Sequence, residues 1–149
     1  MDGPTLAGYV EFLRDYAQIN TTYLPDGSPY IDYSYKVAVK TCSETMGTID
    51  AFLYTSAVYN LATDVLYTIA KDQPDQTYFA SYQKKYQIHT LVPGVVKSAS
   101  DESTSSSLVV PMFFDRLTMG QLQNLKTPYG RMYLSIVQDL GSLSLFGIM

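Results

Sequence analysis

The stretch from Ile49 to Ala70 constrains the fold more than any other part of the chain. Apolar residues recur there at helical spacing, which predicts one helix of roughly six turns, about 33 Å at 1.5 Å per residue. An apolar face this wide has to pack against more than one neighbour. Asn60, Asp64 and several threonines interrupt the stretch, so it is typical of a buried helix rather than of a membrane span.

Two helices are predicted before this central one. Thr5 is a cap residue in front of apolar positions at helical spacing, and Ser28-Pro29 places a cap and a first-turn proline after the turn Pro25-Asp26-Gly27. The second helix is expected to run to about Thr45. Its expected face contains Tyr30, Tyr33 and Val37, with Ile31, Tyr35 and Ala38 nearby; the face of the first contains Leu6, Tyr9, Val10, Leu13 and Ala17.

The pattern changes after the central helix. Residues 76–87 are compatible with a short helix or a loop, and their four aromatic side chains favour a half-buried helix. Residues 91–111 place two β-branched stretches around a serine-rich segment, which predicts an extended β-hairpin or loop. Its tip, 98–107, is too polar to be buried, so we expect it to become ordered only in an assembly.

A last helix is predicted from Thr127-Pro128, a second cap-plus-proline pair, to Leu140, with Gly141 ending it. Residues 142–149 then alternate polar and apolar and carry no charge. Such a segment favours an extended docking tail that adds a strand to a partner, with folding back onto its own core as the alternative. The docking side chains would be Leu143, Leu145, Phe146, Ile148 and Met149.

Length bounds the architecture, because 149 residues with 46% hydrophobic content build one compact core. We therefore predict a mainly α fold, a small helical bundle around the long central helix, with the extended hairpin or loop and the tail attached. The single domain would span 1–141 and the tail 142–149. The single cysteine excludes an internal disulfide.

The composition is unusual in its tyrosines and its charges. The chain has fourteen tyrosines, no tryptophan and only 16% charged residues, whereas about a quarter is typical. Tyrosine is common at protein contacts, so this surface favours a subunit of an assembly. A net charge of −4 with ten scattered basic residues argues against tight nucleic-acid binding.

Catalytic groups are scarce. His89 and Cys42 are the only histidine and cysteine, so the usual Cys/His zinc site cannot be built within one subunit. Neither a G-x-G-x-x-G motif nor a phosphate-binding loop is present. Asp101 and Glu102 are adjacent on a polar loop, and Asp2, Asp26 and Asp50 occupy turn or cap positions. We therefore assign no catalytic residue, no cofactor and no metal.

The second half of the chain resembles the head-tail connector, or adaptor, proteins of tailed bacteriophages. The resemblance is carried by three segments and covers about half of the chain. They are Ala57-Val58-Tyr59-Asn60-Leu61-Ala62, then Gly94-Val95-Val96-Lys97-Ser98 with its serine-rich continuation, and finally Leu125-x-Thr127-Pro128-Tyr129-Gly130-Arg131-x-Tyr133-Leu134. The last segment is the most specific. Tyrosines and threonines stand where family members often carry tryptophan or a more alanine-rich central helix.

The resemblance implies a structural virion protein that forms a twelve-subunit homo-oligomeric ring in the phage neck. Its partners would be the portal protein on one side and tail-side neck or tail-completion proteins on the other. Assembly would take place in the host cytoplasm, with no membrane involved. DNA would pass through the channel without specific binding, which fits the low, acidic charge. Thr127, Pro128, Tyr129, Gly130 and Tyr133 would be structural, and the tail would bind the portal or a neighbouring subunit.

A different class of function explains the composition equally well. The chain would then be a helical protein-protein binding module, scaffolding or regulatory and non-enzymatic. Binding to a purified portal protein separates the two hypotheses. A small hydrolase is a third class, and it would require turnover that His89→Ala abolishes.

Overall fold

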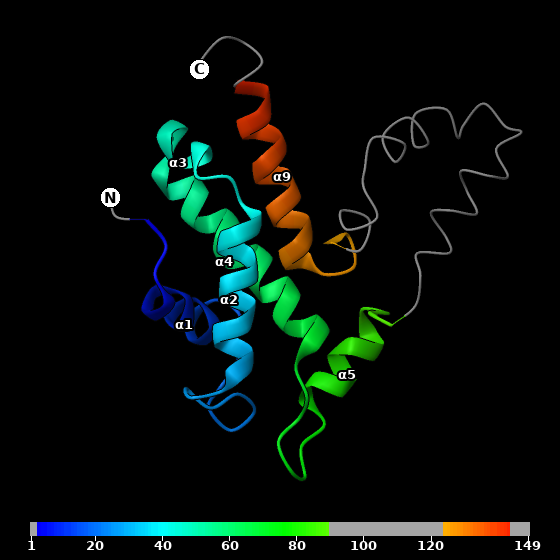
Figure 1. Cartoon of the computed structure of the whole chain (residues 1–149). Coiled ribbons are helices and arrows are strands. Elements are labelled where there is room, and N and C mark those ends of the chain that lie inside the picture. The colour runs from blue at the N-terminus through cyan, green and yellow to red at the C-terminus, as the bar shows by residue number, and fades with distance from the viewer. Residues whose placement is uncertain (1–2, 90–123, 144–149) are drawn as a thin grey trace, which may run out of the picture.

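The computed structural model describes residues 3–89 and 124–143, and these form helices and no strand (Figure 1). The elements are α1 (Leu6–Asp15), α2 (Pro29–Thr41), α3 (Thr45–Ile49), α4 (Ala51–Ile69), α5 (Tyr78–Lys85) and α9 (Pro128–Leu143). The predicted mainly α fold is confirmed. The hairpin or loop expected at 91–111, including its tip at 98–107, lies outside the described residues.

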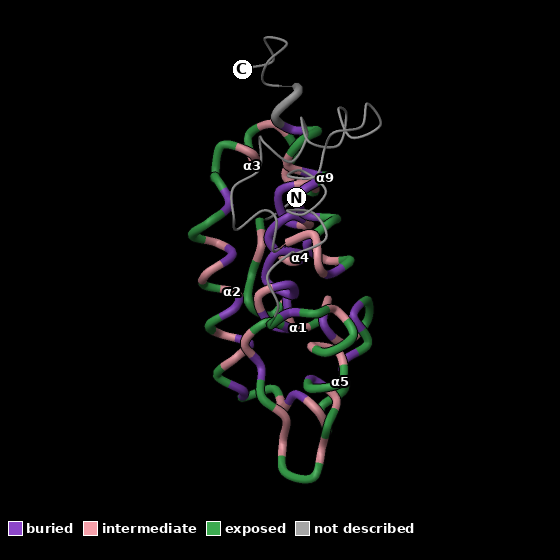
Figure 2. Tube along the Cα trace, turned by 90° about the vertical axis from the view of Figure 1, so that its right-hand side faces the viewer, coloured by how far each residue is buried: buried purple, intermediate pink, exposed green. Residues whose placement is uncertain are grey.

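The predicted central helix is α4, and it organises the bundle. Asp50 caps it by accepting the N–H of Leu53 at 3.0 Å. Both α2 and α9 pack along α4 and run in the opposite direction to it (Figure 1). Burial is therefore concentrated on α4, as Figure 2 shows. No helix in the described part of the chain is long and apolar enough to cross a membrane.

The apolar side chains of the central helix are not all buried. Leu61 and Leu66 are buried, whereas Val65 and Ile69 are half-buried. The polar residues that interrupt the apolar run are buried too, and they find backbone or side-chain partners. Asn60 Nδ2, for example, donates to the Ser56 carbonyl at 2.8 Å. A buried amide is tolerated there because its hydrogen bond replaces water.

The cap predicted for α1 is confirmed, because Thr5 Oγ1 accepts the N–H of Gly8 at 2.9 Å. The helix buries Tyr9 and Leu13, and the Tyr9 hydroxyl lies 2.9 Å from Ser34 Oγ on α2. On its other side, Tyr59 of α4 brings its hydroxyl to 3.1 Å from the Thr5 N–H donor. Helix α1 is thus fixed against both α2 and α4.

Helix α2 begins as predicted but ends earlier. Ser28 Oγ accepts the N–H of Tyr30 at 3.2 Å, and proline occupies the first helical position. The expected end at Thr45 is wrong, since the backbone becomes extended at Cys42. Ser43 Oγ then accepts the N–H of Thr45 at 3.2 Å, which starts the short helix α3.

The short helix predicted within 76–87 is α5, and an aromatic cluster holds it. Asp72 accepts the N–H groups of Phe79 at 2.6 Å and Ala80 at 2.9 Å, so a carboxylate outside the helix caps its first turn. Tyr67 of α4 lies at the centre of the cluster, with its hydroxyl 2.9 Å from that of Tyr78. The rings around Tyr67 belong to Tyr78, Phe79, Tyr82, Tyr86 and Tyr129.

Helix α9 starts at the predicted cap and extends further than expected. The prediction that Gly141 ends it is wrong, because the helix continues to Leu143. A glycine ends a helix only where the chain leaves the helical conformation, and here it does not. Ser142 and Leu143 therefore belong to α9 rather than to an extended tail. Leu145, Phe146, Ile148 and Met149 lie outside the described residues.

Candidate functional site

The residues of the Thr127–Tyr133 motif join α9 to the central helix. Thr127 is fully buried, and its hydroxyl accepts the N–H of Gly130 at 2.9 Å, as predicted for a cap. The same hydroxyl donates to Asp64 Oδ1 of α4 at 2.6 Å. One side chain therefore caps the helix and ties it to a carboxyl group 63 positions earlier in the chain. Pro128 occupies the first turn and is exposed.

The other motif residues fill this junction. Gly130 is buried, and a Cβ there would collide with the Asn124 carbonyl and stand 2.8 Å from Asp64 Oδ1. Tyr129 is half-buried and stacks on Tyr67, with ring centroids 5.7 Å apart. Tyr133 is buried. The motif residues thus build the contact between α4 and α9.

Asp64 makes this junction sensitive to pH. Burial raises the pKa of its carboxyl to about 7, and the Thr127 hydrogen bond opposes that rise only in part. The unfolded chain has a carboxyl pKa of about 4. The folded state therefore holds this proton more tightly, so the group's contribution to stability is complete below about pH 4 and is lost as pH rises to about 7.

We predict that Asp64→Asn removes this pH dependence. Asparagine keeps the shape and an acceptor for Thr127 but carries no titrating proton, so the variant gains stability relative to the wild type as pH rises from about 4 to about 7 and holds that gain above. The measurement is urea unfolding of both proteins at intervals from pH 4 to pH 8. Parallel stability curves for the two proteins would show that Asp64 is not the responsible group.

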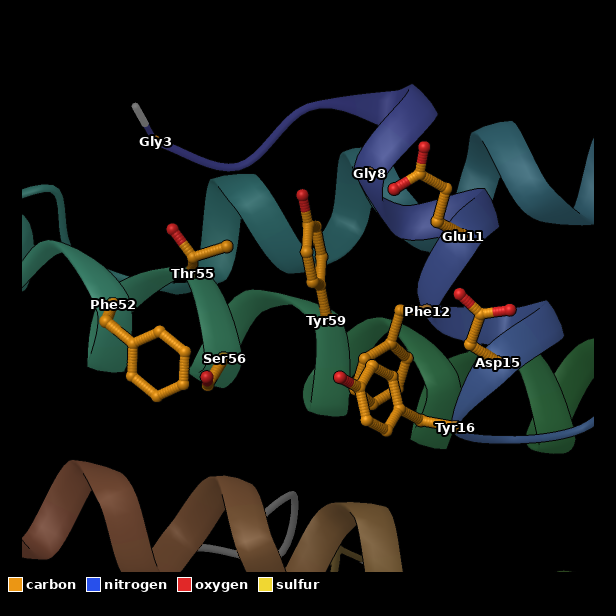
Figure 3. Close-up of a pocket in the computed structure, with 10 residues that line it drawn as sticks. All are labelled: Gly3, Gly8, Glu11, Phe12, Asp15, Tyr16, Phe52, Thr55, Ser56 and Tyr59. Carbon is orange, nitrogen blue, oxygen red and sulfur yellow. The ribbon is translucent and has the colours of Figure 1, made fainter. Parts of the chain in front are cut away.

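A groove between α1 and α4 lies away from this junction (Figure 3). It encloses about 510 Å³. The side chains of Phe52, Thr55, Ser56 and Tyr59 line it from α4, as Figure 3 shows. Gly8 permits the close approach of the two helices, because any side chain there would collide with the Tyr59 hydroxyl. The lining residues are Gly3, Gly8, Glu11, Phe12, Asp15, Tyr16, Phe52, Thr55, Ser56 and Tyr59.

The groove combines exposed aromatic rings with negative charge. Phe52 is 60% exposed and Tyr16 is 77% exposed, and they lie at opposite ends of the groove. The ring of Phe12 packs beside that of Tyr16, with centroids 5.5 Å apart. Glu11 and Asp15 add two carboxylates to the rim on α1. Exposed aromatic side chains gathered in a concave site are typical of protein-protein contacts.

The groups that were considered for catalysis stand apart from this groove. Cys42 is buried, and burial raises the pKa of its thiol to about 12, which disfavours the reactive thiolate. His89 is exposed, with Nε2 3.3 Å from Gln83 Oε1. Residues 3–89 and 124–143 contain no group of three His, Cys, Asp or Glu side chains that could hold a metal ion.

Comparison of the chain with models of protein families, with curated proteins and with solved structures found no match.

The sequence pattern did not predict the Asp64–Thr127 junction or the α1–α4 groove. Asp64 was interpreted only as an interruption of an apolar helix, although a carboxylate in such a run signals a buried partner. The groove has a weaker signal, namely Glu11 with Asp15 and Phe12 with Tyr16, two pairs at i,i+4 spacing away from the apolar face of α1. Their partner Phe52 is contributed by a helix that lies far away in the sequence.

Proposed function

We propose that this chain is a head-tail connector, or adaptor, subunit in the neck of a tailed bacteriophage. It forms a homo-oligomeric ring between the portal protein and the tail-side neck proteins, and it lines the channel through which DNA passes. It performs no catalysis and requires no cofactor. The observation that carries the proposal is the α1–α4 groove, whose exposed aromatic side chains form a surface suited to a protein partner.

Two further observations support the connector over other assembly proteins. The segment of the chain that most resembles the family, Thr127–Leu134, also forms the start of α9 and its hydrogen-bonded junction with α4. The overall charge of −4 suits a channel wall, since a basic wall would hold the phosphates of passing DNA. The twelve-fold number of the ring rests on the resemblance.

The C-terminal segment 144–149 is proposed to dock the subunit onto the portal. It carries Leu145, Phe146, Ile148 and Met149 and no charged side chain. Removing 144–149 is expected to leave the melting temperature of the free subunit nearly unchanged and to abolish binding to portal particles of the same phage. Serine at the four apolar positions is the matched control for length, and it should abolish binding equally.

The binding measurement is co-sedimentation of the subunit with purified portal particles. Full-length protein that does not sediment with the portal would contradict the connector proposal and favour a binding module with another partner. A truncated chain that still binds would remove the docking role from the C-terminal segment. A truncated chain that melts far below the full-length protein would place the segment in the core of its own subunit.

A further inference from the structure

Charge is distributed unevenly over the described residues. Glu11 and Asp15 stand one turn apart on α1, both exposed at the rim of the groove. Arg14, the cation between them, is engaged elsewhere: it donates to the Leu24 carbonyl at 2.8 Å and pairs with Asp26 at 2.6 Å. Within the described part of the chain, neither Glu11 nor Asp15 has a cationic partner. Among the described residues, the groove therefore carries two negative charges without an ion-pair partner.

A region of opposite sign lies where α5 ends and α9 begins. Residues 76–89 and 124–138 contain no aspartate or glutamate but carry Lys84, Lys85, Lys126 and Arg131, which we call the basic corner. Lys126 Nζ donates to the Gln87 carbonyl at 2.8 Å and so joins the two segments. None of the four cations forms an ion pair with another described residue.

The basic corner also offers apolar surface. Lys85 Nζ lies 5.5 Å from the centroid of the Tyr82 ring and 5.9 Å from that of Tyr86, so cation and rings form one patch. Met132 follows Arg131 on α9 and is 52% exposed. A flexible apolar side chain of this kind adapts to an aromatic-lined site. The corner thus has the charge opposite to that of the groove, and both surfaces have exposed apolar side chains.

The two surfaces of one chain cannot meet each other. Helix α1, which forms one wall of the groove, lies on one side of α4, and α5 lies on the other (Figure 1). The corner must therefore find its complement on another molecule. Pairing of groove with groove is disfavoured, because the carboxylates of two chains would then face one another.

We infer that the groove of one subunit receives the basic corner of a second copy of this chain, so that subunits join head to tail. The inference rests on the proposed assembly function and names the surfaces that carry it. The aromatic side chains supply buried area, and the opposite charges fix the orientation. A contact between two different surfaces repeats from copy to copy, and it closes into a ring when the rotation per subunit allows.

Charge reversal tests this contact. The measurement is sedimentation velocity of the full chain at low salt. The double variant Glu11→Lys with Asp15→Lys should weaken self-association about 100-fold, and the double variant Lys84→Glu with Lys85→Glu should weaken it to the same extent. An equimolar mixture of the two reversed chains should associate again, because each reversed surface then meets its opposite. Lys36→Glu with Lys40→Glu on α2 is the matched control outside both surfaces, and it should associate like the wild type.

Three results would overturn the inference: reversed chains that associate like the wild type, a mixture no more associated than its components, or a wild type that stays monomeric at every concentration. Circular dichroism of each variant is the control that its helices are retained. The proposed connector function is tested separately, by binding to the portal. Self-association through these surfaces without portal binding leaves the inference standing, whereas a portal-bound ring that neither reversal weakens leaves only the connector function.

Discussion

Leu66→Ala is expected to lower the free energy of unfolding by about 2 to 5 kcal/mol. Leu66 is fully buried on α4, the helix against which α2 and α9 both pack. Alanine removes most of the packed side chain and leaves a cavity that the surrounding helices close only in part. The measurement is urea unfolding, in which the midpoint should fall while the dependence on denaturant stays the same.

Leu6→Ala is the matched control for this change. Leu6 is the same residue type, but it is 40% exposed on α1, so less packing is lost. We expect a loss below about 1 kcal/mol there, since surface substitutions away from special features have small effects. A loss below about 1 kcal/mol at Leu66 itself would show that this face of α4 is not the core.

Gly130→Ala is expected to destabilise the protein by about 1 to 3 kcal/mol, the usual cost of overpacking. The added methyl would collide with the backbone carbonyl of Asn124 and crowd Asp64 Oδ1 at 2.8 Å. A backbone carbonyl cannot move aside as a flexible side chain does, so the segment at Asn124 or the first turn of α9 would have to shift. This steric cost has to exceed the roughly 0.5 to 1 kcal/mol by which alanine favours a helix over glycine.

Gly27→Ala is the control, because a Cβ at Gly27 meets nothing within 4 Å. Its effect should stay within about 0.5 kcal/mol. Thermal or urea unfolding of both variants distinguishes crowding at the α4–α9 junction from a general effect of losing glycine. A Gly130→Ala protein that is more stable than the wild type would contradict the close packing of that junction.

Local signals predicted much of this fold. The caps at Thr5, Ser28 and Thr127 were placed correctly, because a cap hydrogen bond joins residues two or three positions apart. The long central helix was predicted from apolar residues that recur at helical spacing, and α4 (Ala51–Ile69) ends close to the expected bounds. Gly141 shows the limit of such signals, since a glycine can equally continue a helix when the backbone around it stays helical.

Contacts distant in the sequence could not be predicted in the same way. Tyr33 was expected on the packed face of α2 but is 58% exposed, while Ser34 is fully buried. Tyrosines occur on several sides of α2, so periodicity alone does not choose the buried one. Burial of Ser34 is tolerated because its hydroxyl forms a hydrogen bond with the Tyr9 hydroxyl of α1. Burial of Asp64 is tolerated because its carboxyl accepts a hydrogen bond from Thr127. Each pairing becomes evident only once the helices are placed.

Electron microscopy of the full-length chain mixed with the portal protein of the same phage tests the proposed function most directly. A connector should appear as a closed ring, coaxial with the portal and stacked on one of its faces. The decisive sample is the mixture, because the proposed ring binds the portal directly. Bare portals beside unassembled subunits, at concentrations where the chain is folded, would contradict the proposal.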